Sequence, residues 1–481
     1  MANKKIVKNY LYDLAYQILL LITPLLTTPY ISRVLGATNL GIYDYVSANA
    51  AYFVLLGTVG TSLYGRREVA FYQDDQKKRT KVFFEIVIIR GILTTFALIL
   101  YFLLFCNGNK YSLIYRVFIL DIIANMFDIS WFFQGMQDFK KTVIRNAIVK
   151  MTGIIFIFLF VKNKNQLPLY SVCTTLPILL GHLTLWPYLK DYISNDKIKI
   201  DLHAHIKPIF EMFIPQIAIE IYTVLDKTMI GRICENIAEV GYYAQAQKII
   251  KIVLKLVTSI GVVMLPAMAL DYMKGNEEQL QKSIFNSFRY ISFIGIPVML
   301  GVIGISDNFV PWFYGKGYEP ITNLLKIMSV LIVIVGYSTV IGSQYLLATK
   351  QEKIYTVSVM VGSIINFLCN LLLIPSFGSL GASLASVFAE LSVSTIQIIY
   401  TRKKIPIIRY TLQNWKYYFS GMVMFFLIFS LGYYLPTGFF STLFQILVGM
   451  IIYFLLVIVL KDDIISEILN ELKRRNKKSV L

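Results

Sequence analysis

The sequence predicts an all-α polytopic membrane protein. Three observations lead to this fold class: the apolar composition, the long apolar segments and the distribution of positive charge. Apolar residues make up 56% of the 481 residues and charged residues 15%, whereas charged residues are about 25% of a typical globular chain. The mean hydropathy is +0.63. A soluble chain cannot bury so much apolar surface and still present a polar exterior, which excludes a large soluble domain.

Fourteen apolar segments follow one another along the chain. They are too long and too uniformly apolar for barrel strands, and a backbone facing lipid must satisfy its own hydrogen bonds, so we expect helices. At about 21 residues per crossing, fourteen helices would use roughly 294 residues. Residues typical of turns separate several of them, for example at 107–109, 315–317 and 435–438. The predicted spans are 10–32, 42–65, 82–106, 112–135, 143–161, 168–189, 208–231, 240–265, 284–306, 321–347, 354–375, 378–400, 417–435 and 439–460.

Positive charges alternate with the predicted spans. With the N-terminus in the cytoplasm, the inside segments contain 32 Lys and Arg residues and the outside loops contain six. Because Lys and Arg are retained on the cytoplasmic side, this bias predicts that both termini are cytoplasmic and that the number of spans is even. The net charge of +18 then reflects topology and attraction to the membrane surface, and indicates no nucleic-acid partner.

A weak internal repeat relates the loop after span 1 to the loop after span 7. Arg33 precedes Gly41 by eight residues in the first loop, and Arg232 precedes Gly241 by nine in the second. Each glycine is followed by aromatic residues at the start of the next span. The two loops are therefore predicted to occupy equivalent positions in two related halves.

A second spacing supports the same division. Residues 70 and 90 are Ala and Arg, and so are residues 269 and 289, twenty residues apart in each case. The repeat predicts an N-terminal six-helix bundle in 1–205 and a C-terminal six-helix bundle in 206–405. The remaining 406–481 would hold spans 13 and 14 and a basic cytoplasmic tail. Transporters commonly bind their substrate at the interface between such repeats.

Two motif regions stand out in the sequence. One is Trp131-Phe132-Phe133-Gln134-Gly135, at the end of span 4. The other lies around span 7 and includes Leu225-Asp226-Lys227 and Glu239-Val240-Gly241-Tyr242-Tyr243. Both regions resemble the Wzx-type polysaccharide and O-unit flippases, and the resemblance covers essentially the whole chain. It implies the MATE-like fold of the MOP superfamily, with 14 transmembrane helices in two six-helix bundles around a central cavity plus two C-terminal helices, in the bacterial cytoplasmic membrane.

The resemblance also implies a substrate. These flippases move undecaprenyl-pyrophosphate-linked oligosaccharide repeat units from the cytoplasmic to the outer leaflet. Lipid II flippases of the same superfamily carry an Arg-rich motif at the first span, whereas residues 21–26 here are uncharged. This difference favours a capsule, exopolysaccharide or O-unit substrate. The implied partners are the polyprenyl-pyrophosphate-linked oligosaccharide, membrane lipids and the polymerase or assembly proteins of polysaccharide synthesis.

Cations inside the spans are the first candidates for substrate binding. A flippase must carry a pyrophosphate through about 30 Å of hydrocarbon, and stripping water from that group is costly unless fixed charges replace it. Lys248, Lys251 and Lys255 are spaced i, i+3 and i+7 and share one face of the span 8 helix. We expect this face to line the central cavity, with Lys227 and Arg90 as further candidates. Alternatively, the lysines pair with carboxylates and are structural.

Carboxylates inside the spans are candidates for coupling to H⁺ or Na⁺. Glu220 in span 7 and Glu390 in span 12 could each couple an ion or neutralise a neighbouring lysine. Asp121 and Asp128 lie on one face of span 4 together with Asn125. This acidic stripe either binds a coupling cation or pairs with one of three basic residues, Arg90, Arg116 and Lys150; pairing is favoured.

Three prolines mark candidate hinges for gating. Pro24 and Pro29 interrupt hydrogen bonding in span 1, and Pro215 does so in span 7, the first helix of each predicted bundle. We expect these helices to bend during alternating access. The alternative is that the prolines are merely tolerated, as they commonly are in membrane helices.

No motif indicates catalysis, a metal or an organic cofactor. His203 and His205 are expected in a solvated cytoplasmic loop, because a metal site needs more ligands than this pair provides. Phosphate-binding glycine loops and nucleophile–base motifs are absent from the sequence. We therefore predict a protein that is not an enzyme, and an ion as the only cofactor to consider.

Two other functions deserve comparison. A MATE-like exporter of organic cations or drugs would share the fold but need an anionic site, which the lysines of span 8 do not provide. A membrane glycosyltransferase or polymerase would need a large loop or catalytic domain, and the longest predicted connections, 66–81 and 190–207, are too short. The flippase is therefore the leading hypothesis.

Overall fold

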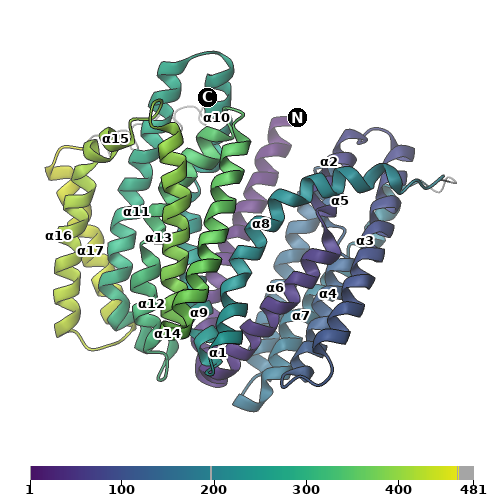
Figure 1. The fold of residues 1–481 in the computed structure, drawn as a ribbon, viewed down its shortest axis with the longest axis horizontal. Coiled ribbons are helices and arrows are strands. Elements are labelled where there is room, and N and C mark those ends of the chain that lie inside the picture. The colour runs from purple at the N-terminus through teal and green to yellow at the C-terminus, as the bar shows by residue number, and fades with distance from the viewer. Residues whose placement is uncertain (1, 195–197, 463, 465–481) are drawn as a thin grey trace. The chain divides into compact units, whose positions relative to one another are not determined.

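The structure is a computed structural model that describes residues 2–194, 198–462 and 464, and within them all side chains except those of 2–16, 18, 139, 140, 212, 214–223 and 262. Every regular element in these ranges is helical. They form two compact units (Figure 1). Unit 1 is the chain up to Ala244 together with Ile374–Ser379, and unit 2 is Gln245–Leu373 together with the chain from Leu380 onward.

Unit 1 contains the helices of the first six predicted spans and also that of span 7. Its α-helices are α1 (Ala2–Thr58), α2 (Thr61–Phe71), α3 (Gln76–Phe105), α4 (Ser112–Met126), α5 (Ser130–Gly135), α6 (Phe139–Phe160), α7 (Leu167–Leu183) and α8 (His203–Ile233). Two short 3₁₀ helices, η1 (Lys164–Gln166) and η2 (Trp186–Asp191), flank α7.

Unit 2 contains the remaining helices. Helix α9 (Ala238–Thr258) begins in unit 1 and continues into unit 2. The others are α10 (Gly261–Met273), α11 (Glu277–Tyr314), α12 (Pro320–Ser329), α13 (Leu331–Thr339), the π-helix η3 (Val340–Leu346), α14 (Glu352–Thr401), α15 (Ile407–Gln413), α16 (Trp415–Tyr434) and α17 (Phe439–Val459). Residues Ile374–Ser379 of α14 belong to unit 1.

Two of the helices are too long for one crossing and contain a break at a glycine. Helix α1 has 57 residues and leaves helical geometry at Gly36 (φ 78°, ψ 166°); Figure 1 shows it turning back on itself. Helix α14 has 50 residues and a break at Gly378 (φ 55°, ψ −131°). A continuous helix of 57 residues would be about 85 Å long, against ~30 Å of hydrocarbon. Each helix therefore corresponds to two predicted spans.

Each of the fourteen predicted spans coincides with helical structure, so the all-helical prediction is confirmed for the described residues. Nine helices there are long and apolar enough to cross a membrane, or ten if α9 and α10, bent by 41°, form one span. That number counts α14 as one span, although α14 corresponds to two predicted spans. Helix α4 has only 15 residues. Fourteen crossings remains a prediction.

The aromatic motif at residues 131–135 forms the centre of the unit 1 core. Trp131, Phe132 and Phe133 are buried on α5 and pack with Phe83 of α3. A Cβ on Gly65 of α2 would lie 2.5 Å from the indole of Trp131. The motif therefore joins α2, α3 and α5 by close packing and leaves no room for a larger side chain at Gly65.

Helices α16 and α17 pack against α11 inside unit 2. The hydroxyl of Tyr453 in α17 donates to the carbonyl of Phe293 in α11 at 2.7 Å. Near the other end of α11, Asn308 donates to the amide oxygen of Gln445 in α17 at 3.1 Å. Because both contacts are buried, these two helices are integral to the packing of unit 2.

An ion pair connects α11 to Asp462, which follows the C-terminal end of α17. Arg289 of α11 contacts the carboxylate of Asp462 at 2.7 Å, and the hydroxyl of Tyr417 donates to the same carboxylate at 2.8 Å. Partial burial raises the pKa of Asp462, but the hydrogen bonds from Arg289, the Ile464 N–H and Tyr417 outweigh it and hold the pKa below its ordinary value. Asp462 is thus charged at neutral pH.

Candidate functional site

The predicted lysine face exists on α9. Lys251 and Lys255 are exposed and Lys248 is half-buried. On the opposite side of the same helix, Ile250 and Val257 are fully buried. Since successive residues are about 100° apart, the three lysines share a side that the apolar packing of unit 2 does not use.

The other predicted cations and carboxylates lie in different places. In unit 1, Lys227 is half-buried on α8 and Arg90 is 1% exposed on α3. Glu390 is half-buried on α14 and lies close enough to Tyr355 for an electrostatic interaction. The side chain of Glu220 lies outside the described residues. Lys227 and Arg90 therefore belong to unit 1 and the lysines of α9 to unit 2.

A partly buried charged network connects α3, α5, α6 and α7 inside unit 1. Asp128 Oδ1 lies 2.9 Å from Nδ1 of His182, and Arg145 Nη1 lies 3.1 Å from the same ring nitrogen. Arg145 Nη2 donates to the hydroxyl of Ser130 at 2.5 Å, and that hydroxyl donates to Asp128. Arg90 interacts electrostatically with Asp128. One carboxylate, two guanidinium groups and one imidazole thus share this site, in which the arginines are buried and the side chains of His182 and Asp128 are 12% and 21% exposed.

The chemistry of this network depends on one nitrogen atom. His182 Nδ1 faces an acceptor, the carboxylate of Asp128, and a donor, the guanidinium of Arg145. A protonated Nδ1 donates to Asp128, whereas an unprotonated Nδ1 accepts from Arg145; it cannot do both. Gain or loss of one proton would therefore change the partner of His182 without any movement of the backbone.

Local sequence explains how these groups meet. Helix α4 ends at Met126, and Asp128 accepts from the backbone N–H of Ser130 at 2.9 Å, which fixes the break before α5. Trp186 donates to the carbonyl of Phe127 in the same break at 3.0 Å. A Cβ on Gly181 would lie 2.0 Å from Val149, so α6 and α7 approach too closely for any other residue there. His182 follows that glycine directly.

The structure changes the interpretation of the acidic stripe. Asp128 lies beyond the end of α4, so only Asp121 and Asn125 share that helix. Of the three predicted cationic partners, Arg90 interacts with Asp128, and Arg116 donates to the carbonyl of Cys106 at 3.2 Å. His182 and Arg145 were missed, because a lone histidine at the end of an apolar span gives no sequence signal for its distant partners.

The prediction for His205 was wrong. His203 is exposed, but His205 is only 7% exposed, and its two ring nitrogens lie 2.7 Å from the Tyr64 hydroxyl and 2.8 Å from a carboxylate oxygen of Glu85. Glu85 is 1% exposed. A buried carboxylate needs hydrogen-bonding partners, and His205 provides one at the start of α8. No group of three or more potential metal ligands occurs in the described part of the chain.

The predicted hinge prolines lie within continuous helix. In α1 only Gly36 departs from helical geometry, so the helix passes through Pro24 and Pro29 without a break. The hydroxyl of Thr27 donates to the carbonyl of Thr23 at 3.0 Å and satisfies one of the groups near the first proline. The side chain of Pro215 lies outside the described residues.

The two glycines that the internal repeat equates contact each other. A Cβ on Gly41 would lie 2.1 Å from the carbonyl oxygen of Ile237, and a Cβ on Gly241 would lie 2.6 Å from that of Ala37. Both residues belong to unit 1. The loop after span 1 and the loop after span 7 therefore meet backbone to backbone, at the end of the spans that the charge pattern predicts to be outside.

A third loop joins this contact through Glu239. Its carboxylate accepts from the backbone N–H of Ser379 at 3.0 Å and from the Ser379 hydroxyl at 2.5 Å. A Cβ on Gly378 would lie 2.9 Å from the same carboxylate. This contact holds the break of α14 against the start of α9, so Glu239 and Gly241 of the predicted motif both have structural partners here.

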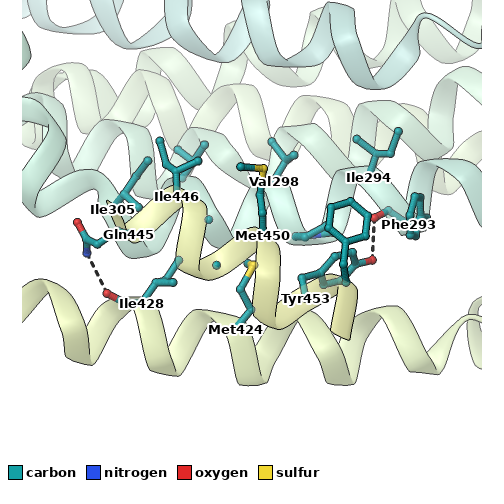
Figure 2. A pocket seen from close by; sticks show the side chains of 15 residues that line it. Phe293, Ile294, Val298, Ile305, Met424, Ile428, Gln445, Ile446, Met450 and Tyr453 are labelled. Atoms are coloured by element: carbon teal, nitrogen blue, oxygen red, sulfur yellow. Dashed lines mark hydrogen bonds between the residues drawn. The ribbon is translucent and has the colours of Figure 1, made fainter. Parts of the chain in front are cut away.

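An apolar groove runs along unit 2 between α11, α16 and α17 (Figure 2). Its volume is about 320 Å³. Val298 and Ile305 of α11, Met424 of α16 and Met450 of α17 point into it. The polar lining group Gln445 is engaged, since its amide donates to the carbonyl of Ile428 at 2.9 Å. The groove offers an apolar chain a continuous lining of hydrocarbon and thioether groups.

The fold defines a class, the helical proteins with many candidate membrane spans. The structure resembles that of "Lipid II flippase MurJ, inward closed conformation", with a TM-score of 0.76 and 17% identity, over 95% of this chain and 100% of that chain. It also resembles an inward-facing MATE family multidrug resistance transporter, with a TM-score of 0.61 and 11% identity, over 81% of this chain and 99% of that one. The chain belongs to the family described as polysaccharide biosynthesis protein, which matches residues 6–270.

Curated relatives agree with this assignment. The chain is 23% identical over 405 residues to a protein of Escherichia coli K12 described as "Putative O-antigen transporter", covering 82% of this chain and 96% of the relative. It is 22% identical over 418 residues to "Lipid II flippase MurJ" of Bacillus subtilis 168, covering 75% of this chain and 76% of the relative. The family predicted from the sequence motifs is confirmed.

Proposed function

We propose that this protein flips polyprenyl-pyrophosphate-linked oligosaccharide repeat units across the bacterial cytoplasmic membrane, for synthesis of a capsule, exopolysaccharide or O-unit polysaccharide. The lysine face of α9 carries the proposal. Three cations share one side of α9, and the helix uses its opposite side for apolar packing. Ammonium groups at this position suit a pyrophosphate, whose transfer through hydrocarbon is otherwise prohibitive.

The apolar groove of unit 2 supplies the second half of a lipid-linked substrate site. A polyprenyl chain is a long hydrocarbon, and the groove presents apolar side chains from three helices (Figure 2). The chain can thus remain in an apolar environment while the charged head group meets the lysines.

The Gly41–Gly241 contact and the Glu239–Ser379 hydrogen bonds support alternating access. They join three loops at the predicted outer end of unit 1. We take them to be the closed outer gate, which must separate before the head group can leave. Gly36 and Gly378, where α1 and α14 leave helical geometry, flank these contacts and supply the backbone freedom for that separation.

The His182 network supports coupling to protons. The imidazole of His182 can carry a proton on either or both of its ring nitrogens. It faces Asp128 and Arg145 directly, and Asp121 and Arg90 complete the charged surroundings. The exchange of partners at Nδ1 would link proton binding to the packing of α5, α6 and α7.

An ion-coupled exporter of small organic cations is the alternative, favoured by the likeness of the fold to the MATE transporter. It would require anionic groups to bind the cation. The charged side chains exposed on α9 are those of Lys251 and Lys255 instead. Lipid-linked anions therefore agree better with the side chains of this chain.

The proposal is tested by charge reversal at Lys251 and Lys255. Replacing both with Glu should slow export of the glycan by roughly a hundredfold or more, because hydrogen bonds to charged groups contribute ~1.5–3 kcal/mol each. Replacing both with Arg should retain partial export. Surface polysaccharide and membrane abundance would be measured together, with Lys282→Glu, an exposed lysine of unit 2, as the control. Normal polysaccharide in the double Glu variant at normal abundance would refute a role for these lysines.

A further inference from the structure

A second groove lies on unit 1 between α6 and α7. Its volume is about 650 Å³. One end is polar and is lined by Asp138, Lys141, Thr184 and Tyr188. The rest is apolar and includes Ile148. The groove is separate from the apolar groove of unit 2 and from the lysine face of α9.

The apolar part of this groove opens sideways from the helix pair. Ile148 is 60% exposed and Leu180 is 52% exposed, although both are large hydrocarbon side chains. In a membrane protein such side chains face lipid, so the groove is accessible from the bilayer. Lys141 and Phe156, at its two ends, are fifteen residues apart on α6, or about 22 Å. That length exceeds the ~15 Å of hydrocarbon in one leaflet.

The polar end carries two described cations and one carboxylate. Lys141 Nζ lies 4.9 Å from the ring centroid of Tyr188 and 4.7 Å from that of Tyr192, and 3.6 Å from the carboxylate of Asp138. Its side chain is 24% exposed. Arg145 also reaches the lining and contacts Ser130 and His182. Lys141, Arg145 and Asp138 together give the described lining a net charge of +1, which suits a ligand of charge −1.

The sequence places this polar end at the cytoplasmic leaflet. Residues 140, 141 and 145 are basic and belong to a segment that the charge distribution predicts to be inside. Anionic phospholipids give that leaflet its negative surface potential, and Tyr188 and Trp186 are residue types enriched at membrane interfaces. The headgroup of an inner-leaflet lipid would therefore lie at the height of Lys141.

We propose that the α6–α7 groove is a binding site for one anionic glycerophospholipid, with its phosphodiester on Lys141 and one acyl chain along Ile148 and Leu180. The phosphodiester carries the single negative charge that the net charge of this lining balances, and the hydroxyls of Tyr188 and Thr184 line the same end for its oxygen atoms. A polyprenyl pyrophosphate, with at least two negative charges, would leave charge unbalanced here. The groove shares no residue with the substrate site proposed for unit 2 and does not rest on the proposed function.

The test uses the full-length protein in detergent and native mass spectrometry. Wild-type protein should retain phosphatidylglycerol in preference to phosphatidylcholine with the same acyl chains. Lys141→Glu should reduce phosphatidylglycerol retention at least about fivefold, the effect expected for one basic residue near a lipid phosphate, and Ile148→Trp, which fills the groove, should reduce retention of both lipids. Lys282→Glu, an exposed lysine of unit 2 with the same charge change, should behave as wild type.

Two outcomes would overturn the proposal. The first is equal phosphatidylglycerol retention by wild type, Lys141→Glu and Ile148→Trp with unchanged thermal unfolding in all three. The second is Lys141-dependent binding of undecaprenyl phosphate without such binding of phosphatidylglycerol, which would assign the groove to the polyprenyl lipid. Because Ile148 is exposed, its replacement is expected to leave folding intact, and a shared unfolding temperature would verify this.

Discussion

At the scale of single residues, His182 has two competing partners. The carboxylate of Asp128 and the guanidinium of Arg145 compete for one ring nitrogen, at 2.9 and 3.1 Å. Arg145 lies on α6 and Asp128 lies between α4 and α5, and both form a hydrogen bond with the hydroxyl of Ser130. A change in protonation would thus alter hydrogen bonds between helices, which is what coupling an ion to a conformational change requires.

This geometry predicts the behaviour of His182→Gln. Glutamine keeps a donor and an acceptor at the site but cannot bind a proton, so the protein should remain folded with a stability change of about 1 kcal/mol. Its export rate should no longer depend on an imposed pH gradient. His203→Gln, at an exposed histidine outside the network, is the matched control. An unchanged pH dependence in His182→Gln would show that protons act elsewhere.

At the scale of helices, the groove between α11, α16 and α17 is the place proposed for the polyprenyl chain. Gly301 of α11 lies in its lining, and no heavy atom lies within 4 Å of where its Cβ would be. In contrast, a Cβ on Gly304 of the same helix would lie 2.8 Å from Ile428. One glycine therefore opens the groove and the other allows close packing of the helices.

Gly301→Leu should slow transport without lowering the stability of the protein. The substitution improves helix propensity by ~0.8 kcal/mol and meets no neighbour, so the protein should unfold at the same or a higher temperature. The new side chain would occupy the space of two or three methylene groups of a polyprenyl chain; overlap of this kind costs ~1–3 kcal/mol and should slow flipping by about tenfold. Flipping at the wild-type rate would contradict the placement of the lipid chain. Gly304→Leu is the control for lost packing and should lower the unfolding temperature.

Helices were predictable from the sequence where a local signal specified them. Long apolar runs predicted the helical segments, and Gly378 lies where the turn residues separated two spans. The charged network was not predictable as a whole. Its members, residues 90, 128, 145 and 182, lie on separate elements, and only their packing brings them together. His205 was misinterpreted because nothing near it in the sequence reveals Glu85, 120 residues away.

At the scale of the whole molecule, the distribution of charge specifies the topology. Thirty-two basic residues on the predicted inside and six on the outside make the orientation testable on a variant without the four native cysteines. New cysteines at Lys110 or Lys316 should react with an impermeant thiol reagent in intact cells, and cysteines at Gln76 or Lys403 should react only after permeabilisation. All four native residues are exposed. Equal labelling of all four positions would contradict the predicted topology.

The division into units also differs from the repeat in one respect. Helix α8 and the start of α9 belong to unit 1, although the repeat assigns them to the second half. The contact between Gly41 and Gly241 explains this, because it joins the equivalent loops of both halves within a few ångströms. The proposed outer gate therefore lies at the place where the two repeats meet, as alternating access between repeats requires.

The central claim, that the protein flips a lipid-linked oligosaccharide, is tested most directly in proteoliposomes. Vesicles would contain the purified protein and an undecaprenyl-pyrophosphate-linked oligosaccharide with a fluorescent sugar, and an impermeant reductant added outside would destroy only the fluorescence of the outer leaflet. With wild-type protein, the reductant should reach all of the labelled lipid. With the Lys251→Glu, Lys255→Glu double variant, it should reach only the labelled lipid that starts in the outer leaflet. Both kinds of vesicle, with wild-type protein and without protein, would be tested under an imposed pH gradient of either sign. If the inner-leaflet fluorescence were protected equally in both, the claim would be contradicted.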